Sequence, residues 1–270
     1  MLTDSDIQRY QDEGQVVLPN RLSEELVSCI ERRSTELLED NPDLSIDYVP
    51  GLVEIDDQWL AVGCIPMILD AVEQLIGPDI LTWGSGFFGK PANDGIETPW
   101  HQDGEYWPIQ PLATCTAWIA IDDATPENGC LRVVPGSHKA RKLFPHTTPE
   151  GDYTLYRRLE DTSSAEVGAR DVILERGQIS IHDVFMIHGS RPNQSSKSRR
   201  GVTFRFMPTT SHFDYELNRK LVRERGVLDL GDRKLFLLRG TDRSGKNRIV
   251  SHPKNLDRFW DGRTATLAAD

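Results

Sequence analysis

The spacing of apolar residues predicts helices in the first third of the chain. Thr3 is suited to cap a short helix that ends near Gly14. Ser23 is suited to cap a second helix, in which apolar residues recur at helical spacing and Glu and Arg occupy the other face. Pro66 begins a third helix, at a position where proline is tolerated, and Gly77 ends it. These patterns predict that the N-terminal part of the chain is mainly helical.

From about residue 79 the pattern changes to that of short strands. Short apolar and β-branched runs are separated by glycine, proline and asparagine, which favour turns. Strands are predicted over residues 80–88, 114–121, 130–134, 172–174, 179–187 and 201–207. Many short strands with such turns are typical of a β-sandwich or barrel. Residues 139–168 are polar and predict a long surface excursion, of the kind that often forms a lid or a binding loop.

The pattern predicts one domain over residues 1–270, in three parts. The parts are a helical region over about 1–78, a β core over about 79–208 and a C-terminal extension over about 209–270. The extension has mixed charge and scattered aromatic residues. Two roles remain open for it, covering a pocket or forming a subunit contact, and the sequence does not specify an oligomeric state.

Composition narrows the range of partners and compartments. The net charge of −11 argues against nucleic acid, because proteins that bind it usually carry a basic excess. The four cysteines have wide, irregular spacing and form no metal or redox motif. No apolar leader opens the chain, and no apolar run approaches the length that spans a membrane. We therefore expect a cytoplasmic protein with free thiols, and neither a nucleic acid nor a membrane as partner.

Three residues form a candidate metal site. His101 and Asp103 are two residues apart, so on a strand they would point to one side and offer a nitrogen and a carboxylate oxygen to one metal ion. Such a pair alone is more often a hydrogen-bonding pair at the surface. His188, 87 residues after His101 and at the end of an apolar run, supplies a third ligand. Two histidines and a carboxylate leave one side of the ion open, which suits Fe(II), whereas structural zinc favours a closed, cysteine-rich shell.

Arg199, 11 residues after His188, is the candidate for binding a carboxylate. It begins a strand on which one face is apolar (Val202, Phe204, Phe206) and the other carries Arg199, Gly201, Thr203 and Arg205. Small residues beside Arg199 would leave room for a ligand, and a planar guanidinium can donate two parallel hydrogen bonds to a carboxylate. Arg200 and Arg205 compete with Arg199 for this role, and His182 competes for a place among the metal ligands.

A series of motifs occurs in a characteristic order. The series is Trp100-His101-Gln102-Asp103-Gly104, Ala117-Trp118-Ile119-Ala120-Ile121-Asp122-Asp123, Glu127-Asn128-Gly129-Cys130-Leu131, Pro135-Gly136-Ser137-His138, His188-Gly189-Ser190 and Arg199. In combination, over about residues 3–208, these motifs resemble the phytanoyl-CoA dioxygenase (PhyH) family of iron- and 2-oxoglutarate-dependent oxygenases. The resemblance implies a mainly β fold with flanking helices, namely a double-stranded β-helix (cupin-like jelly roll).

The resemblance also implies roles for individual residues. His101, Asp103 and His188 would bind Fe(II), and Arg199 would pair with the distal carboxylate of the co-substrate 2-oxoglutarate. Ser190 would hydrogen-bond the same carboxylate. Trp118 matches a family position close to the co-substrate, although aromatic residues on strands are often simply part of the core.

The implied enzyme is a dioxygenase. It uses O₂ to hydroxylate an unactivated C–H bond of a small-molecule metabolite and releases succinate and CO₂. Related halogenases lack the metal carboxylate, so the presence of Asp103 favours hydroxylation, or a desaturation variant, over halogenation. Tyr106 and Trp107, shortly after the first ligands, either wall the substrate pocket or pack at the barrel mouth. No glycine-rich phosphate loop is present, which favours a small polar metabolite or a biosynthetic intermediate over a CoA thioester.

Two other functions are compatible with a metal-binding barrel. One is a cupin-type metalloenzyme that does not use 2-oxoglutarate, and Arg199 with Ser190 argues against it because such an enzyme needs no carboxylate site. The other is a non-catalytic small-molecule-binding barrel. The complete set of three ligands argues against that function, because a binding protein has no need for all of them.

Overall fold

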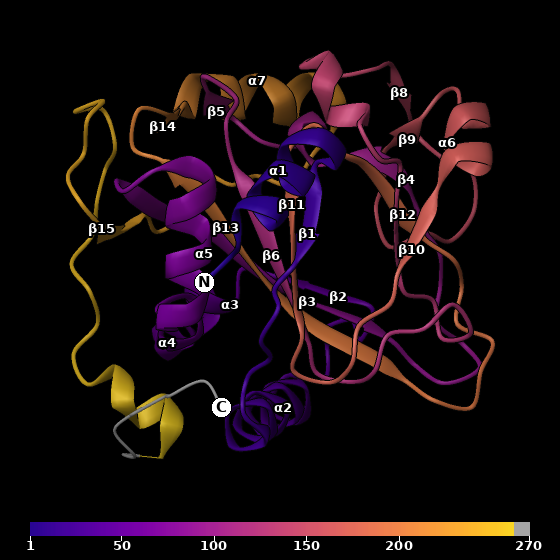
Figure 1. Cartoon of the computed structure of the whole chain (residues 1–270), viewed down its shortest axis with the longest axis horizontal. Coiled ribbons are helices and arrows are strands. Elements are labelled where there is room, and N and C mark those ends of the chain that lie inside the picture. Colours follow the sequence, from indigo (N-terminus) through magenta and orange to yellow (C-terminus); the bar gives the residue numbers. More distant parts are fainter. Residues whose placement is uncertain (262–270) are drawn as a thin grey trace.

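Two antiparallel sheets form the centre of the protein in the computed structural model, which describes residues 1–261 (Figure 1). The larger sheet has the order β1-β11-β6-β13-β3-β15, and β2 also pairs with β3. Its strands are β1 (Gln15–Val17), β11 (Ile179–Asp183), β6 (Cys115–Ala120), β13 (Arg199–Pro208), β3 (Ile80–Lys90), β15 (Phe236–Arg239) and β2 (Tyr48–Pro50). Neighbouring strands in this sheet are far apart in sequence, as in a jelly roll.

The smaller sheet has the order β10-β7-β12-β4. Its strands are β10 (Arg170–Val172), β7 (Leu131–Val133), β12 (Ile187–Ser190) and β4 (Thr98–Gln102). Two short ribbons accompany the sheets, β5 (Ile109–Gln110) with β14 (His212–Phe213) and β8 (His146–Thr147) with β9 (Arg158–Leu159). The predicted mainly β architecture with helices around it is therefore confirmed.

The three helices that the sequence predicts in this region begin where expected, and the first and third also end where expected. The Thr3 hydroxyl accepts from the backbone N–H of Asp6 and the Asp6 carboxylate accepts from that of Thr3, which caps α1 (Asp4–Glu13) at both residues. Gly14 ends α1 with a φ of 82°, a conformation that glycine adopts without strain. Ser23 caps the second helix and Pro66 lies in the first turn of another. The remaining helical elements in this part are α2 (Glu24–Asp40), α3 (Leu52–Ile55), η1 (Asp57–Trp59), α4 (Leu60–Gly63) and α5 (Pro66–Ile76).

The helices cover the outer face of the larger sheet, and this contact forms the main core. On β13, Val202, Phe204 and Phe206 point outward into that core, as the alternation predicts. Gly63 of α4 allows the helix to approach closely, because a Cβ there would lie 2.7 Å from the ring of Phe204. The residues between them on β13 face the space between the two sheets. One strand therefore separates the main hydrophobic core from the cavity.

Three of the strand predictions differ clearly from the structure. The run 179–187 is not one strand, because the Asp183 carboxylate accepts from the N–H of Phe185 and turns the chain from β11 in the larger sheet to β12 in the smaller one. Likewise β4 ends at Gln102, so Asp103 lies in the turn η2 (Asp103–Glu105) and not on the strand. In the smaller sheet, β10 begins at Arg170, two residues before the start predicted for that strand.

The excursion at residues 139–168 is only partly a surface loop. It contains the ribbon β8–β9, the end of η3 (Ser137–Ala140) and α6 (Ser163–Gly168). Leu155, Leu159 and Ala165 are buried there. The segment is therefore held to the protein at a few buried positions.

The C-terminal extension returns to the β core at several places. β14 pairs with β5, β15 adds to the edge of the larger sheet beside β3, and α7 (Tyr215–Arg225) lies across one end (Figure 1). The last helical turn, η4 (Leu256–Trp260), packs Phe259 against Trp59 with ring centroids 5.0 Å apart. Residues 262–270 of the predicted extension lie outside the described residues.

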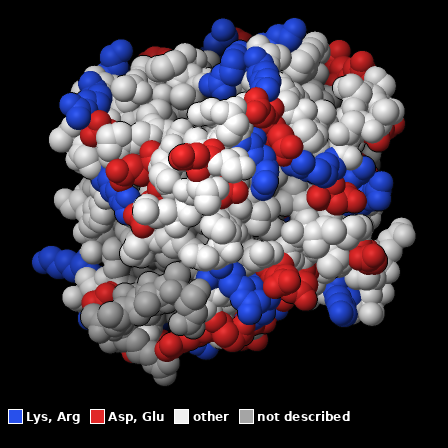
Figure 2. Space-filling model, in the orientation of Figure 1, with Lys and Arg blue, Asp and Glu red and all other residues white. Residues whose placement is uncertain are grey.

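Acidic and basic side chains are interspersed over the face drawn in Figure 2, so the net charge of −11 is not gathered into one field there. Within residues 1–261, no single helix combines the length and apolar character that a membrane span requires; the bent pair Asp57–Gly63 and Pro66–Ile76 passes on length and composition alone.

Candidate active site

Adjacent strands of the smaller sheet bring together two histidines that are 87 residues apart. His101 on β4 and His188 on β12 are direct partners in the ladder, with ring centroids 4.1 Å apart. The Oδ1 atom of Asp103 lies 3.5 Å from Nε2 of His101 and 3.7 Å from Nε2 of His188. These three ligand atoms are all within 4.8 Å of one another. The arrangement is the size of a mononuclear metal site.

Backbone carbonyls fix the orientation of both imidazole rings. Nδ1 of His101 lies 2.8 Å from the carbonyl of Pro99, and Nδ1 of His188 lies 3.0 Å from that of Met186. A carbonyl only accepts, so each Nδ1 carries the proton and each Nε2 directs a lone pair toward Asp103. Burial, together with the neighbouring His101, lowers the pKa of His188 well below its ordinary value. The neutral imidazole is the form that binds a metal.

Two residues of the larger sheet contact the second oxygen of the Asp103 carboxylate. Oδ2 of Asp103 accepts a hydrogen bond of 3.0 Å from the hydroxyl of Thr116 and lies 3.3 Å from Nε2 of His182. Burial alone would raise the pKa of Asp103, but the neighbouring histidines, His188 first and then His101 and His182, hold it well below its ordinary value. The carboxylate is therefore ionised, with Oδ1 left for a metal. His182 contacts this carboxylate and is not one of the three grouped ligands.

All residues predicted for the site line one cavity between the two sheets. Its empty volume is about 870 Å³, counting the open mouth. The lining includes the predicted residues His101, Asp103, Tyr106, Trp107, Trp118, His188, Ser190 and Arg199. Leu228 and Leu230 of the C-terminal extension also line it. Of the two roles left open for the extension, covering the pocket is thus the one seen in this chain.

Arg199 lies at one end of the cavity, and no acidic side chain of residues 1–261 pairs with it. It is 5 % exposed, and its Nε and Nη2 atoms donate to the carbonyl of Gly129 at 3.2 and 3.0 Å. Burial lowers the pKa of Arg199 to about 10. Lys90 lies opposite Arg199 on the neighbouring strand β3 and is also buried. Burial, and next the charge of Arg199, lower the pKa of Lys90 to about 7. Within the described chain Arg199 forms no ion pair, so this end of the cavity favours an anionic ligand.

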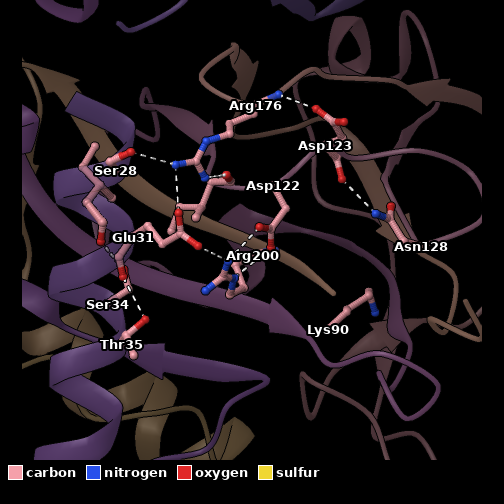
Figure 3. A network of polar contacts seen from close by, with 12 residues as sticks. Ser28, Glu31, Ser34, Thr35, Lys90, Asp122, Asp123, Asn128, Arg176 and Arg200 are labelled. Carbon is pink, nitrogen blue, oxygen red and sulfur yellow. Dashed lines mark hydrogen bonds and ion pairs between the residues drawn. The ribbon is translucent and has the colours of Figure 1, made fainter. Parts of the chain in front are cut away.

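The adjacent Arg200 points away from the cavity, and Figure 3 shows its partners. Its Nε and Nη2 atoms each donate to the Asp122 carboxylate at 2.8 Å, and Glu31 of α2 accepts as well. The hydrogen bond to Asp122 contributes most to raising the pKa of Arg200. Arg176 also contacts Glu31. Arg200 therefore links α2 to the sheet and is not available for a ligand.

The space beside Arg199 is not left for a ligand at Gly201, contrary to the prediction. A Cβ at that position would lie 2.3 Å from Cζ2 of Trp118. The guanidinium of Arg199 lies 5.5 Å from the centroid of the same indole ring. The Trp118 ring therefore occupies the space beside Gly201 on β13 and lies next to Arg199, while it also lines the cavity.

Glu105 was not predicted as part of the site. It is buried, and its carboxylate accepts from Arg157 at 3.0 Å and from Arg225 at 2.7 Å. The neighbouring Tyr106 hydroxyl donates to the carbonyl of Arg157 at 2.7 Å. The residue after the metal motif thus joins the 139–168 excursion and α7 to the mouth of the cavity. No sequence pattern links these three charges, because they come from distant segments.

Replacing Glu105 with alanine is expected to destabilise the fold by about 1.5–3 kcal/mol, because Arg157 and Arg225 lose their charged hydrogen-bond acceptor. Chemical denaturation of the purified protein measures this. Glu216→Ala is the matched control, since Glu216 also pairs with an arginine but is 85 % exposed. Its effect is expected to stay within about 0.5 kcal/mol. Equal effects of the two substitutions would contradict the assigned role of Glu105.

The chain resembles known oxygenases in sequence and in structure. Residues 10–201 match the family model "Phytanoyl-CoA dioxygenase (PhyH)". Peroxisomal phytanoyl-CoA dioxygenase of Bos taurus is 26% identical over 246 residues, which cover 85% of this chain and 70% of that protein. In the human and mouse relatives the matches span 64% and 62% of the protein, slightly less than two thirds.

Solved structures give the same picture. The apo form of the non-heme monooxygenase ThoJ has a TM-score of 0.73 at 26% identity and covers 95% of this chain and 92% of its own. EvdO2 from Micromonospora carbonacea var. aurantiaca, solved with 2-oxoglutarate, has a TM-score of 0.64 at 20% identity, covering 77% and 91%. At that identity the second likeness concerns the fold alone. The predicted double-stranded β-helix is confirmed.

Proposed function

The chain belongs to the phytanoyl-CoA dioxygenase (PhyH) family, and from that premise we propose that it is an Fe(II)- and 2-oxoglutarate-dependent dioxygenase. Its proposed reaction is hydroxylation of an unactivated C–H bond of a small-molecule metabolite, with O₂ consumed and succinate and CO₂ released. One observation carries the proposal. The group of His101, Asp103 and His188 shares a cavity with the buried Arg199, which has no acidic partner in the described part of the chain.

The three side chains at the candidate metal site are suitable ligands for Fe(II). His101 and His188 would supply neutral nitrogens and Asp103 one oxygen, all from one side. When bound, the iron supplies the O₂ chemistry that couples oxidative decarboxylation of 2-oxoglutarate to oxidation of the substrate. The chain's own part is to hold the two Nε2 lone pairs in place through Pro99 and Met186, and to fix Asp103 through Thr116. The presence of Asp103 favours hydroxylation over halogenation.

The opposite end of the cavity fits the distal carboxylate of 2-oxoglutarate. Two polar groups there have no hydrogen bond within residues 1–261, namely Nη1 of Arg199 and the hydroxyl of Ser190. Arg199 would pair with the carboxylate and Ser190 would donate to it. The ring of Trp118 would pack against the guanidinium of Arg199 and help to hold it in position.

The mouth of the cavity would bind the substrate. Tyr106 and Trp107 form one wall, and Leu228 and Leu230 of the C-terminal extension form another. This apolar cover would exclude water from the reacting groups. Because the extension completes the pocket, we also propose that residues 1–270 act as one catalytic domain.

Succinate release tests this function directly. Purified protein with Fe(II), ascorbate and O₂ is expected to convert 2-oxoglutarate to succinate and CO₂ in equal amounts, slowly alone and faster when a substrate from a metabolite panel is present. The measurement is succinate by mass spectrometry alongside O₂ uptake. Iron binding without any succinate would instead favour the cupin-type enzyme. Failure to bind iron would favour the non-catalytic barrel.

A further inference from the structure

A second buried arginine faces the same cavity and has no role in the site described so far. Arg205 follows Arg199 by six residues on β13 and points to the same side of the strand. It is 7 % exposed. In the lining of this cavity, as far as the chain is described, Arg199 and Arg205 are the two arginine or lysine side chains.

Among the described residues, the guanidinium of Arg205 has no partner of opposite charge. No ion pair and no side-chain hydrogen bond forms to it within residues 1–261, and its Nε atom is fully buried without a hydrogen bond. Its one close contact of note is the ring of Trp107, whose centroid lies 5.3 Å away. Burying an unpaired charge is costly, because the lost hydration is not replaced. An anionic ligand bound in the cavity would therefore compensate the unpaired charge of Arg205.

The surroundings of Arg205 are built to hold it in place. Gly84 lies opposite Arg205 in β3, and a Cβ there would come within 3.2 Å of Cδ of Arg205. Trp107 packs edge-on against Trp83, with ring centroids 4.8 Å apart. The indole N–H of Trp83 in turn donates to Thr114 at 3.0 Å. A glycine thus leaves room for the arginine, and the ring of Trp107, which packs against Trp83, lies over its guanidinium.

Arg205 lies beside the candidate metal ligands and away from Arg199. Its ladder partner on the adjacent strand β6 is Thr116, the residue whose hydroxyl donates to Asp103. The Cα atoms of Arg199 and Arg205 are separated by six residues of extended strand, roughly 20 Å. Arg205 is thus placed for a molecule that enters beside the metal ligands, while Arg199 serves the co-substrate at the far end.

We propose that Arg205 anchors a carboxylate of the primary substrate, so that the enzyme acts on small carboxylate-bearing molecules. This inference rests on the proposed function of the cavity. A planar guanidinium matches a carboxylate in shape and offers parallel hydrogen bonds. The charges also balance one to one, whereas a doubly charged phosphoryl group would leave one negative charge uncompensated in a cavity whose other arginine is committed to 2-oxoglutarate.

The first test needs no knowledge of the substrate. Arg205→Met removes the charge and keeps an unbranched apolar side chain of similar length. Without ligand, this variant is expected to unfold at the same temperature as the wild type or a higher one. A structural role for Arg205 predicts the opposite, a Tm lowered by several degrees, and that result would overturn the proposal.

The second test measures ligand preference in protein loaded with Mn(II) and saturated with 2-oxoglutarate under anaerobic conditions. The probes are propionate, benzoate and N-acetylglycine, each compared with its primary amide and its phosphonate analogue by calorimetric titration. Wild type is expected to bind the carboxylates at least tenfold more tightly than the amides, and Arg205→Met is expected to lose that preference. The Kd for 2-oxoglutarate, titrated separately, is expected to stay within twofold of the wild-type value.

Each contrary outcome identifies what has failed. Carboxylate preference that persists in Arg205→Met would overturn the role of Arg205. Stronger binding of the phosphonates would replace the carboxylate with a phosphoryl group as the recognised chemistry. If wild type fails to bind 2-oxoglutarate in the control titration, the proposed function fails, independently of Arg205.

Discussion

Asp103→Ala is expected to abolish 2-oxoglutarate turnover, with a fall in kcat/KM on the order of 1000-fold or more. Loss of groups that merely orient a metal ligand already costs about 10–100-fold, and Asp103 would be a ligand itself. The variant removes the one anionic donor between His101 and His188. The rate of succinate formation at saturating Fe(II) measures the effect, and iron content after gel filtration measures metal retention.

Thr116→Val is the graded comparison for this prediction. Valine keeps the shape of threonine but removes the hydroxyl that donates to Oδ2 of Asp103. Because the ligand remains and only its support is lost, Fe(II) affinity is expected to fall by about 10–100-fold. If Asp103→Ala keeps iron and at least a tenth of wild-type turnover, the assignment of the carboxylate as ligand is wrong.

Arg199→Gln is expected to raise the KM for 2-oxoglutarate by about 100-fold or more. Truncating one partner of a buried, hydrogen-bonded charge pair costs about 2–5 kcal/mol, and each 1.4 kcal/mol is about tenfold in affinity. The substitution leaves a side chain that still donates hydrogen bonds but carries no charge. Initial rates of succinate formation across a range of 2-oxoglutarate concentrations provide the measurement.

Arg200→Gln is the matched control, because it makes the same chemical change one residue along the same strand. Arg200 is bound to Asp122 and Glu31 on the other side of the sheet (Figure 3). Its substitution is expected to lower stability, since it breaks the link between α2 and the sheet, and to leave the KM for 2-oxoglutarate unchanged. A larger KM effect for Arg200→Gln than for Arg199→Gln would reverse the assignment of the two arginines.

Short-range rules explain why much of the site could be predicted. The alternation of side chains along β13 separates Arg199 and Arg205 from Arg200, and the structure follows that alternation. For Asp103 the prediction correctly places the side chain beside His101, but it wrongly assumes that both residues lie on one strand. The residue lies in a turn after β4, and it reaches the two histidines because that turn bends toward the cavity.

Contacts between distant segments could not be predicted from local patterns. Glu105 is joined to Arg157 and Arg225, which lie 52 and 120 residues away. Leu228 reaches the pocket only because the extension pairs back onto the core. Whether Gly201 leaves an open space depends on where Trp118 packs, which is decided across the sheet and not along the strand. These features arise from tertiary packing, for which the sequence pattern carries little information.

The most direct test of the central claim is an anaerobic titration followed by visible spectroscopy. Fe(II) is added to the apo-protein, and 2-oxoglutarate is then titrated in. A weak metal-to-ligand charge-transfer band is expected to appear with 2-oxoglutarate in the wild type, to be absent in Asp103→Ala, and to need about 100-fold more 2-oxoglutarate in Arg199→Gln. Iron that binds to the wild type without producing the band at any 2-oxoglutarate concentration would contradict the account.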